Sequence, residues 1–296
     1  MMAPMATPAM LPPNCVICGQ AQRAWIDQSL WQCPACGHLS APERLNELPL
    51  TTGSLDESQR SMGLSPLRRR NAEDCLAALR KHTDGRSVTI CDVGCGPGWF
   101  GTFAQSRGID VLAIEPDQAM VETARASGLN VRPGAFPDCL RPDERFDALV
   151  FNDVWEHLSD ARGMAKACEL HLDRYGVLLI TLPSRQGALF RLATLAWQMG
   201  MRGPMDRLWQ KGFPSPHLHY YSPPGLARLM KSCGFDLVEQ RAMASFQLRG
   251  LWSRLRMDSR LSLTQSLTTW SVLAALLPFH STMPSDSVLQ VFRRQA

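Results

Sequence analysis

A short glycine-dense segment has the composition of a ligand-binding turn. The hydrophobic run Val88–Val93 ends in Gly94-Cys95-Gly96-Pro97-Gly98, and helical spacing begins at Phe100. Glycines let a ligand approach the backbone closely, and the first amides of a helix are free to bind it. Glu115 ends the next hydrophobic run, Val111–Ile114, where an acid can accept both hydrogen bonds of a ribose diol. The spacing predicts a strand, a turn and a helix that together hold a nucleoside.

Charge distinguishes between two nucleoside ligands. Gly96, Gly98 and Gly101 satisfy the dinucleotide fingerprint, which is a weak signal on its own. Asp92 directly before the turn would repel a pyrophosphate, but it suits a ligand that carries an ammonium and a sulfonium. The turn therefore favours S-adenosylmethionine over NAD.

Four cysteines form two closely spaced pairs near the N-terminus. They are Cys15, Cys18, Cys33 and Cys36, and a glycine follows each pair. Four thiolates in two such knuckles close a tetrahedral zinc site with no open position, so a bound zinc would be structural. Four free cysteines in a loop are the alternative. His38 is a candidate substitute ligand, although we expect it to be a solvated side chain beside the knuckle.

His157 is the candidate general base. Methyl transfer from a sulfonium needs a base only when the acceptor must lose a proton. Asp153, Glu156 and His157 stand at helical spacing and share one face of a helical turn. A structural histidine that caps the loop is the alternative. His217 and His219 lie on one side of an extended stretch and are predicted to line the substrate entrance, or else to hydrogen-bond within a loop.

The remaining sequence alternates between helical and strand patterns, which predicts an α/β fold with a parallel sheet. The expected strands are Val88–Val93, Val111–Ile114, Asn130–Arg132, Phe146–Phe151, Val177–Leu182, Leu237–Ala242 and Val288–Phe292. The expected helices are Leu67–His82, Phe100–Arg107, Gln118–Ala126, Ala161–Leu172, Gly187–Gly200 and Pro223–Ser232. The apolar helix 187–200 fits either a core element or a lid. Residues 246–284 show no clear period.

These motifs resemble those of class I S-adenosylmethionine-dependent methyltransferases. The residues 92–98 look like their first motif, Glu115-Pro116-Asp117 like their second, and Phe146–His157 like their fourth-strand motif. The stretch 217–223 with Gly234-Phe235 is similar to the subgroup that contains ubiquinone-type O-methyltransferases. The resemblance implies a Rossmann-like, doubly wound sheet of about seven strands, here preceded by a small zinc ribbon.

The resemblance also implies roles for individual residues. Cofactor contacts are expected from Asp92, Gly94, Cys95, Gly96, Gly98, Glu115, Pro116, Ala135, Phe136, Asn152 and Asp153, and catalytic roles from His157, Asp153 and His217. Ala135 and Phe136 would flank the adenine. In ubiquinone O-methyltransferases a Glu-x-x-Glu-His sequence is tied to a divalent cation. Here Asp153 replaces the first glutamate, so an acidic turn that closes the cofactor site is the alternative to a cation site.

Composition limits the partners. The net charge of +4 is too weak to indicate a nucleic-acid partner, and the segment 14–40 holds only Arg23 as a full positive charge. We expect a small-molecule, saccharide or lipid-linked acceptor, with methylation on oxygen favoured. The alternatives are an RNA methyltransferase whose ribbon binds RNA, and a non-catalytic scaffold that keeps the cofactor fold. The basic amphipathic segment 248–260 could contact membrane phospholipid or be a solvated face.

The expected organisation is a zinc-ribbon module over 14–45, a linker over 46–65 and a methyltransferase domain over 66–296. Helical insertions are expected near 186–216 and 246–284. No signal peptide and no apolar stretch of membrane-spanning length is evident, so we expect a cytoplasmic protein. The sequence does not indicate an oligomeric state.

Overall fold

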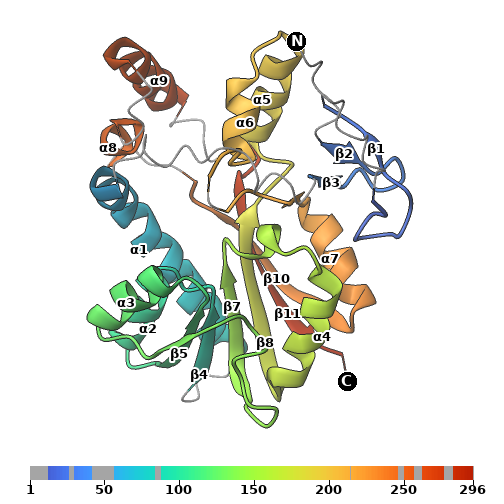
Figure 1. Ribbon diagram of the computed structural model, residues 1–296, viewed down its shortest axis with the longest axis vertical. Coiled ribbons are helices and arrows are strands. Elements are labelled where there is room, and N and C mark those ends of the chain that lie inside the picture. Colours follow the sequence, from blue (N-terminus) through green and yellow to red (C-terminus); the bar gives the residue numbers. More distant parts are fainter. Residues whose placement is uncertain are drawn as a thin grey trace, which may run out of the picture.

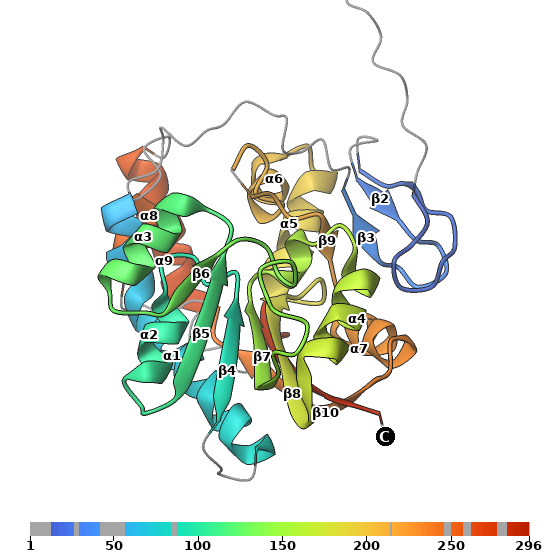
Figure 2. The same ribbon diagram turned by 60° about the horizontal axis from the view of Figure 1, so that its bottom comes forward.

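The fold is a seven-stranded sheet between two layers of helices, seen in a computed structural model (Figures 1 and 2). The structure describes residues 13–26, 30–41, 57–83, 88–213, 215–245, 250–256, 262–276 and 283–295. The strands of the large sheet, in spatial order, are β10 (Phe235–Met243), β11 (Ser287–Arg294), β8 (Leu172–Pro183), β7 (Phe146–Asn152), β4 (Thr89–Val93), β5 (Asp110–Glu115) and β6 (Val131–Pro133). The predicted α/β class and the seven-stranded, Rossmann-like architecture are confirmed.

The strand order reverses at the centre of the sheet. Strand β4 pairs in parallel with both β5 and β7, while β11 pairs antiparallel with β8 and β10. The chain therefore runs outward in one direction through β5 and β6, and in the other direction through β7 and β8. In open α/β sheets ligands bind beyond the carboxyl ends of the strands at such a reversal.

The helices cover both faces of the sheet. The layers consist of α1 (Glu57–His82), α2 (Trp99–Gln105), α3 (Gln118–Ala126), α4 (Ala161–His171) and α7 (Pro223–Ser232). The helices α5 (Ala188–Gln198), α6 (Gly203–Leu208), α8 (Leu251–Arg256) and α9 (Leu263–Leu276) lie beyond the carboxyl ends of the central strands (Figure 1). Alternate residues of β7 enter different cores: Leu149 and Phe151 pack with α4 and α7, whereas Ala148 and Val150 pack with α1, α2 and α3. Two buried faces explain the continuous hydrophobic runs of the parallel strands.

Side-chain caps begin several of the helices. The Asp117 carboxylate accepts hydrogen bonds from the amides of Ala119 and Met120, so α3 begins at Gln118 as expected. The Ser222 hydroxyl caps α7 by accepting from the Gly225 amide, and Pro223 and Pro224 occupy its first turn.

One helix boundary differs from expectation, and helices occupy both of the expected insertions. Helix α1 begins at Glu57, so residues 57–65 are helical where we expected a linker. Helix α6 lies inside the expected insertion 186–216, with its short apolar face covered by α5. The segment 246–284, which showed no period, holds α8 and α9 in its described part. No helix of the described residues is both long and apolar enough to cross a bilayer.

The described residues 13–26 and 30–41 carry the paired cysteines, and we call them the cysteine segment. This segment shares a second sheet with the C-terminal half of the chain. This four-stranded sheet has the order β1 (Arg23–Ala24), β2 (Trp31–Gln32), β3 (Leu39–Ser40) and β9 (His219–Tyr220). Strand β3 pairs antiparallel with β9, Leu39 opposite Tyr220 and Ser40 opposite His219. The cysteine segment is also bound to α4, where the Arg162 guanidinium donates to the backbone carbonyls of Val16 and Ile17, at 2.9 Å each.

Candidate active site

The turn between β4 and α2 lies at the point of strand reversal. Gly94, Gly96 and Gly98 all have positive φ angles, of 69°, 53° and 86°. A Cβ on Gly94 would lie 2.7 Å from Val154, in the loop after β7, so a side chain there would push the two loops apart. A Cβ on Gly96 would meet nothing within 4 Å. Gly96 therefore faces open space beside the turn, where a ligand can approach the backbone.

The Glu115 carboxylate lies against this turn. It accepts a hydrogen bond of 2.7 Å from the Gly96 amide and one of 3.0 Å from the Asp117 amide. The side chain is buried at the carboxyl end of β5. Two backbone donors fix the orientation of the carboxylate, which retains lone pairs for a further donor such as a ribose hydroxyl.

Asp92 is a buried acid with an unused oxygen. Its residue is 2% exposed, and Oδ2 has no hydrogen-bond partner. Burial raises its pKa to about 7, a hydrogen bond from the Gly101 amide opposes this, and the charge of Glu115 adds to the rise. A carboxylate in this position stabilises a cation that approaches the turn, because removing it from water has left its charge uncompensated.

Other predicted cofactor residues occupy different environments. The amide nitrogen of Asn152 is buried and has no hydrogen-bond partner, while its oxygen accepts from Thr181. Ala135 and Pro116 are exposed, and the Cys95 thiol contacts the Gly96 carbonyl. Phe136 is instead buried in the core, edge to face with Phe151 and His171. Its ring is therefore engaged by other aromatic rings, and we no longer assign it to the adenine.

Glu156, His157 and His217 gather beside the turn. One donor atom from each residue lies within 4.8 Å of the others, although His217 follows the other two by about 60 residues in the chain. The histidine rings are 4.9 Å apart, and His217 Nε2 is 3.9 Å from Glu156 Oε1. Asp153, which we expected to join His157, is exposed with a φ of 53° and is not part of this group.

The reason is local backbone geometry. Residues Trp155–His157 form a 3₁₀ turn, η3, rather than an α-helical turn that begins at Asp153. The turn buries Glu156 and leaves Asp153 outside it. The sequence motif contained this acid, but spacing alone did not show that its carboxylate lies next to His217.

The three side chains of this cluster have little solvent to stabilise charge. Burial and the nearby Asp153 charge raise the pKa of Glu156 well above its usual value, and neither of its oxygens has a hydrogen-bond partner. Burial and the His157 charge lower the pKa of His217 to about 3. Burial also lowers the pKa of His157, and its hydrogen bond to the Pro216 carbonyl opposes the change. The histidines are neutral near pH 7.

The hydrogen bonds of His157 select its tautomer. Its Nδ1 lies 2.8 Å from the Pro216 carbonyl oxygen, which can only accept a hydrogen bond. The proton of the neutral ring is therefore on Nδ1, and Nε2 carries the free lone pair. The Ser215 hydroxyl lies 3.2 Å from the same Nδ1.

The segment 216–221, which we call the histidine segment, is held from two sides. The Leu218 amide donates to the Glu156 carbonyl, and the Leu218 carbonyl accepts from the Ala41 amide in the cysteine segment. His38 is buried and its Nε2 lies 3.0 Å from His219 Nδ1. The expectation that His38 is solvated was therefore wrong, because it directly precedes β3, whose pairing with β9 places it next to His219. Tyr220 and Tyr221 are also buried.

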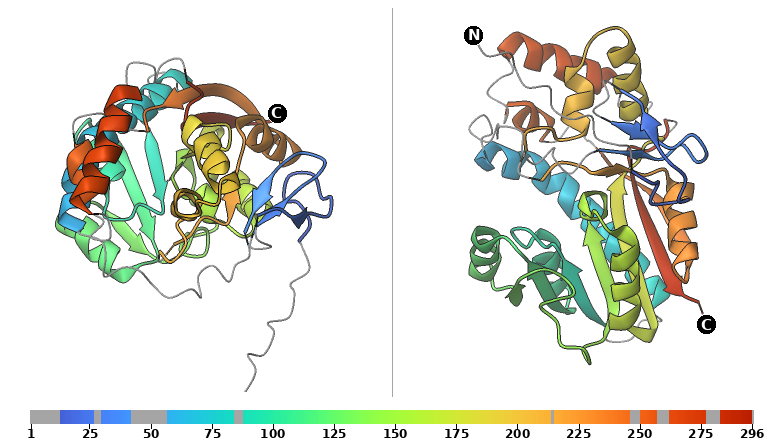
Figure 3. Two further views of the ribbon diagram at one scale, coloured as in Figure 1. Left: turned by 90° about the horizontal axis from the view of Figure 1, so that it is seen from above. Right: turned by 45° about the vertical axis from the view of Figure 1, so that its right-hand side comes forward.

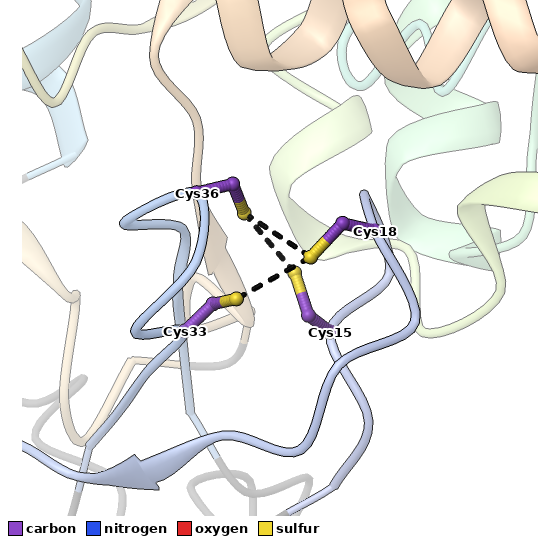
Figure 4. A group of neighbouring side chains, drawn as sticks. All are labelled: Cys15, Cys18, Cys33 and Cys36. Carbon is purple, nitrogen blue, oxygen red and sulfur yellow. Dashed lines mark hydrogen bonds between the residues drawn. The ribbon is translucent and has the colours of Figure 1, made fainter.

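The four paired cysteines converge on one point (Figure 4). The sulfur atoms of Cys15 and Cys36 are 3.5 Å apart, those of Cys18 and Cys33 3.4 Å, and those of Cys18 and Cys36 3.7 Å. Four sulfurs about 2.3 Å from a central zinc would be about 3.8 Å apart, so the donor set fits a tetrahedral ion.

Comparison with known proteins agrees with the geometry. A model described as a methyltransferase domain matches residues 64–240, more than half of the chain. The ubiquinone biosynthesis O-methyltransferase of Azorhizobium caulinodans is 25% identical over 203 residues, covering 64% of this chain and 77% of its own. That of Methylobacterium sp. is 24% identical over 179 residues, covering 57% and 68%.

Solved structures share the fold at low sequence identity. The plantazolicin methyltransferase BpumL in complex with SAH aligns with a TM-score of 0.55 at 10% identity, covering 86% of this chain and 93% of its own. Magnesium protoporphyrin IX methyltransferase from Synechocystis PCC 6803 aligns with a TM-score of 0.51 at 13% identity, covering 81% and 89%. With the glycine turn and the strand reversal in place, the chain belongs to the methyltransferase domain family and is an S-adenosylmethionine-dependent methyltransferase.

Proposed function

We propose that the protein transfers the methyl group of S-adenosylmethionine to a hydroxyl oxygen of a small-molecule, saccharide or lipid-linked acceptor. The observation that carries this proposal is the 2.8 Å distance between His157 Nδ1 and the Pro216 carbonyl oxygen. Since the carbonyl can only accept, the proton is on Nδ1 and Nε2 is free as a base. Oxygen acceptors need such a base because a hydroxyl is a weak nucleophile until it loses its proton. The names of the relatives from ubiquinone biosynthesis support an oxygen acceptor.

The cofactor roles follow from charge and from open space. In this proposal the methionine ammonium lies near the Asp92 carboxylate, and the Glu115 carboxylate accepts from the ribose. Gly96 leaves space for the cofactor beside the backbone, and the Asn152 amide donates to the methionine part. These residues orient the cofactor, whose sulfonium supplies the reactive methyl group.

A divalent cation is a second candidate for activating the acceptor. It is favoured by the unpartnered Glu156 carboxylate, which lies 3.9 Å from His217 at a cluster with cation-binding composition. Glu156, His157 and His217 would hold the ion, which would act as a Lewis acid towards the acceptor oxygen. Because Nε2 of His157 would then be a ligand, the cation and base roles exclude each other.

We also propose that the four cysteines hold a structural zinc ion, on the basis of their sulfur separations. Strand β3 pairs with β9 in the histidine segment, so the zinc would indirectly stabilise the position of this segment beside the proposed acceptor site.

The cofactor proposal is tested by titrating the protein with S-adenosylmethionine. Gly96→Arg should abolish micromolar binding, because the side chain fills the open space beside the turn. Gly108→Arg is the matched control: Gly108 also has a positive φ, 77°, and open space around it, but it lies after α2. Equal loss of affinity in both variants would attribute the effect to backbone strain and contradict the proposal.

The affinity for S-adenosylmethionine should fall as the pH falls below about 7. The free Asp92 carboxyl has a pKa of about 7, and the bound ammonium favours the carboxylate, so the pKa drops in the complex. Binding then releases a proton below pH 7, and the affinity decreases by up to about tenfold per pH unit, while it is constant above pH 7. Calorimetry in Asp92→Asn should show weaker and pH-independent binding between pH 5.5 and 7. An unchanged slope in that variant would exclude Asp92 as the group that titrates.

His157→Gln should lower kcat by about 10²–10⁴-fold because the variant has no base. The assay is tritium transfer from S-adenosylmethionine, first screened over phenols, saccharides and polyprenyl alcohols to choose an acceptor. Affinity for the cofactor should remain within about twofold of wild type, since the side chain is outside the turn. The cation candidate would be established instead if activity strictly required added Mn²⁺ and if Glu156→Gln abolished the activation by Mn²⁺. Full activity in His157→Gln without any metal would contradict both.

Purified protein should contain one equivalent of zinc, as measured by elemental analysis, and Cys33→Ser should lose it. Hydrogen exchange should then accelerate in residues 30–41 and in the histidine segment, because β9 loses its partner strand. Cofactor affinity should persist, since the glycine turn lies outside the ribbon. Cys233→Ser, which removes a cysteine far from the cluster in the sequence, is the control. Normal hydrogen exchange in the histidine segment of the zinc-free protein would contradict the proposal that the zinc stabilises this segment.

A further inference from the structure

Helix α5 presents an apolar face to solvent. Leu192, Leu195 and Met199 follow one another at helical spacing and are 50%, 52% and 63% exposed. The opposite face is fixed, because Phe190 and Ala193 pack into a core formed with the cysteine segment. The helix cannot rotate to bury its exposed side chains without breaking that core.

Helix α9 is uncharged and almost uncovered. Its 14 residues contain no charged side chain, and among its described side chains only Ser266 is buried. Leu263, Leu267 and Val272 are each about half exposed or more. Six of the 14 residues are Ser, Thr or Gln, so α9 is uncharged rather than apolar on every side, and its exposed leucines and valine are accessible to a partner surface. It is about 21 Å long, which is shorter than a bilayer core of about 30 Å, so the helix can lie along a membrane surface but cannot cross it.

Both helices lie at the same end of the molecule, beyond the carboxyl ends of the central strands (Figure 1). Seen from that end, they flank the sheet on opposite sides (Figure 3). We call their exposed apolar side chains the docking face: Leu192, Leu195, Met199, Met201, Leu263, Leu267 and Val272. The docking face and the histidine segment lie at the same end of the protein, since Tyr220 packs against Phe190 of α5.

The segments around the docking face are basic. Over the whole chain the charges nearly balance, with 31 Lys and Arg against 27 Asp and Glu. Among the described side chains of residues 186–213 and 250–276 the basic ones are Arg191, Arg202, Arg207, Lys211 and Arg256, against the single acid Asp206, which pairs with Lys211. Apolar side chains next to an excess of arginine and lysine are the composition of helices that bind anionic membrane surfaces.

We propose that the docking face binds the surface of an anionic lipid bilayer, with α5 and α9 inserted to the depth of the headgroups. A second copy of the chain is a poorer occupant, because a two-fold interface would bring the same basic segments against each other. Anionic headgroups instead neutralise these segments while the acyl boundary covers the leucines. This inference is independent of the acceptor and of the role of His157.

The test is co-sedimentation of the full chain with phosphatidylcholine vesicles, with and without phosphatidylglycerol. The protein should bind the anionic vesicles and release them at high salt, because screening weakens the charge attraction. The double variant Leu195→Glu/Met199→Glu should bind at least about tenfold more weakly, since it places charge at the acyl boundary. Leu263→Glu/Leu267→Glu should do the same from α9.

Leu170→Glu is the matched control. Leu170 is 63% exposed on α4, away from the docking face, and its replacement should leave vesicle binding unchanged. Retained S-adenosylmethionine affinity in every variant shows that the fold is intact. Equal binding to neutral and anionic vesicles, or equal loss in Leu170→Glu, would overturn the proposal. So would concentration-dependent dimers that the docking-face variants abolish, because a second copy would then be the occupant.

Discussion

The parallel pairing of β4 with β7 is the constraint on which the site depends. It places two loops from separate parts of the chain next to each other: the glycine turn after β4 and the η3 turn after β7. The fit is tight, as a Cβ on Gly94 would lie 2.7 Å from Val154. One loop offers open backbone to a cofactor, and the other carries Glu156 and His157. The sheet thus places the proposed cofactor turn next to the loop that carries the proposed base.

Burial sets the electrostatics of both halves of the site. Asp92 and Glu156 are acids held away from water with oxygens that no protein group satisfies. Such groups cost stability in the empty protein, and a cationic ligand reduces that cost when it binds. The histidines beside Glu156 remain neutral for the same reason, since desolvation disfavours their charged form. The site is therefore poised to receive positive charge from its ligands.

Local signals made much of the fold predictable from sequence. Helices α3 and α7 have the expected bounds because Asp117 and Ser222 cap them through their own side chains. The central strands were readable as hydrophobic runs because both of their faces are buried. Helix α9 was not, because a helix with almost no buried side has no apolar period to detect. The glycine turn and Glu115 were recognisable because they lie at fixed spacing after a strand.

Long-range features were not predictable in this way. The pairing of β3 with β9 involves two residues on each side, too few to form a pattern, and it buries a histidine that we expected in solvent. The approach of His217 to Glu156 depends on that pairing and on η3. Even the role of Phe136 could not be inferred from the sequence, because an aromatic side chain next to a turn can face either the ligand or the core.

The β3–β9 pairing also affects the order of events during synthesis. Leu39 lies opposite Tyr220, 181 positions later in the chain. At translation rates of about 5–20 residues per second, β3 waits roughly 10–40 s for β9 to be synthesised. During that interval the edge of β3 that later pairs with β9 has unpaired backbone groups. The cysteine segment thus reaches its final structure only after β9 has been synthesised.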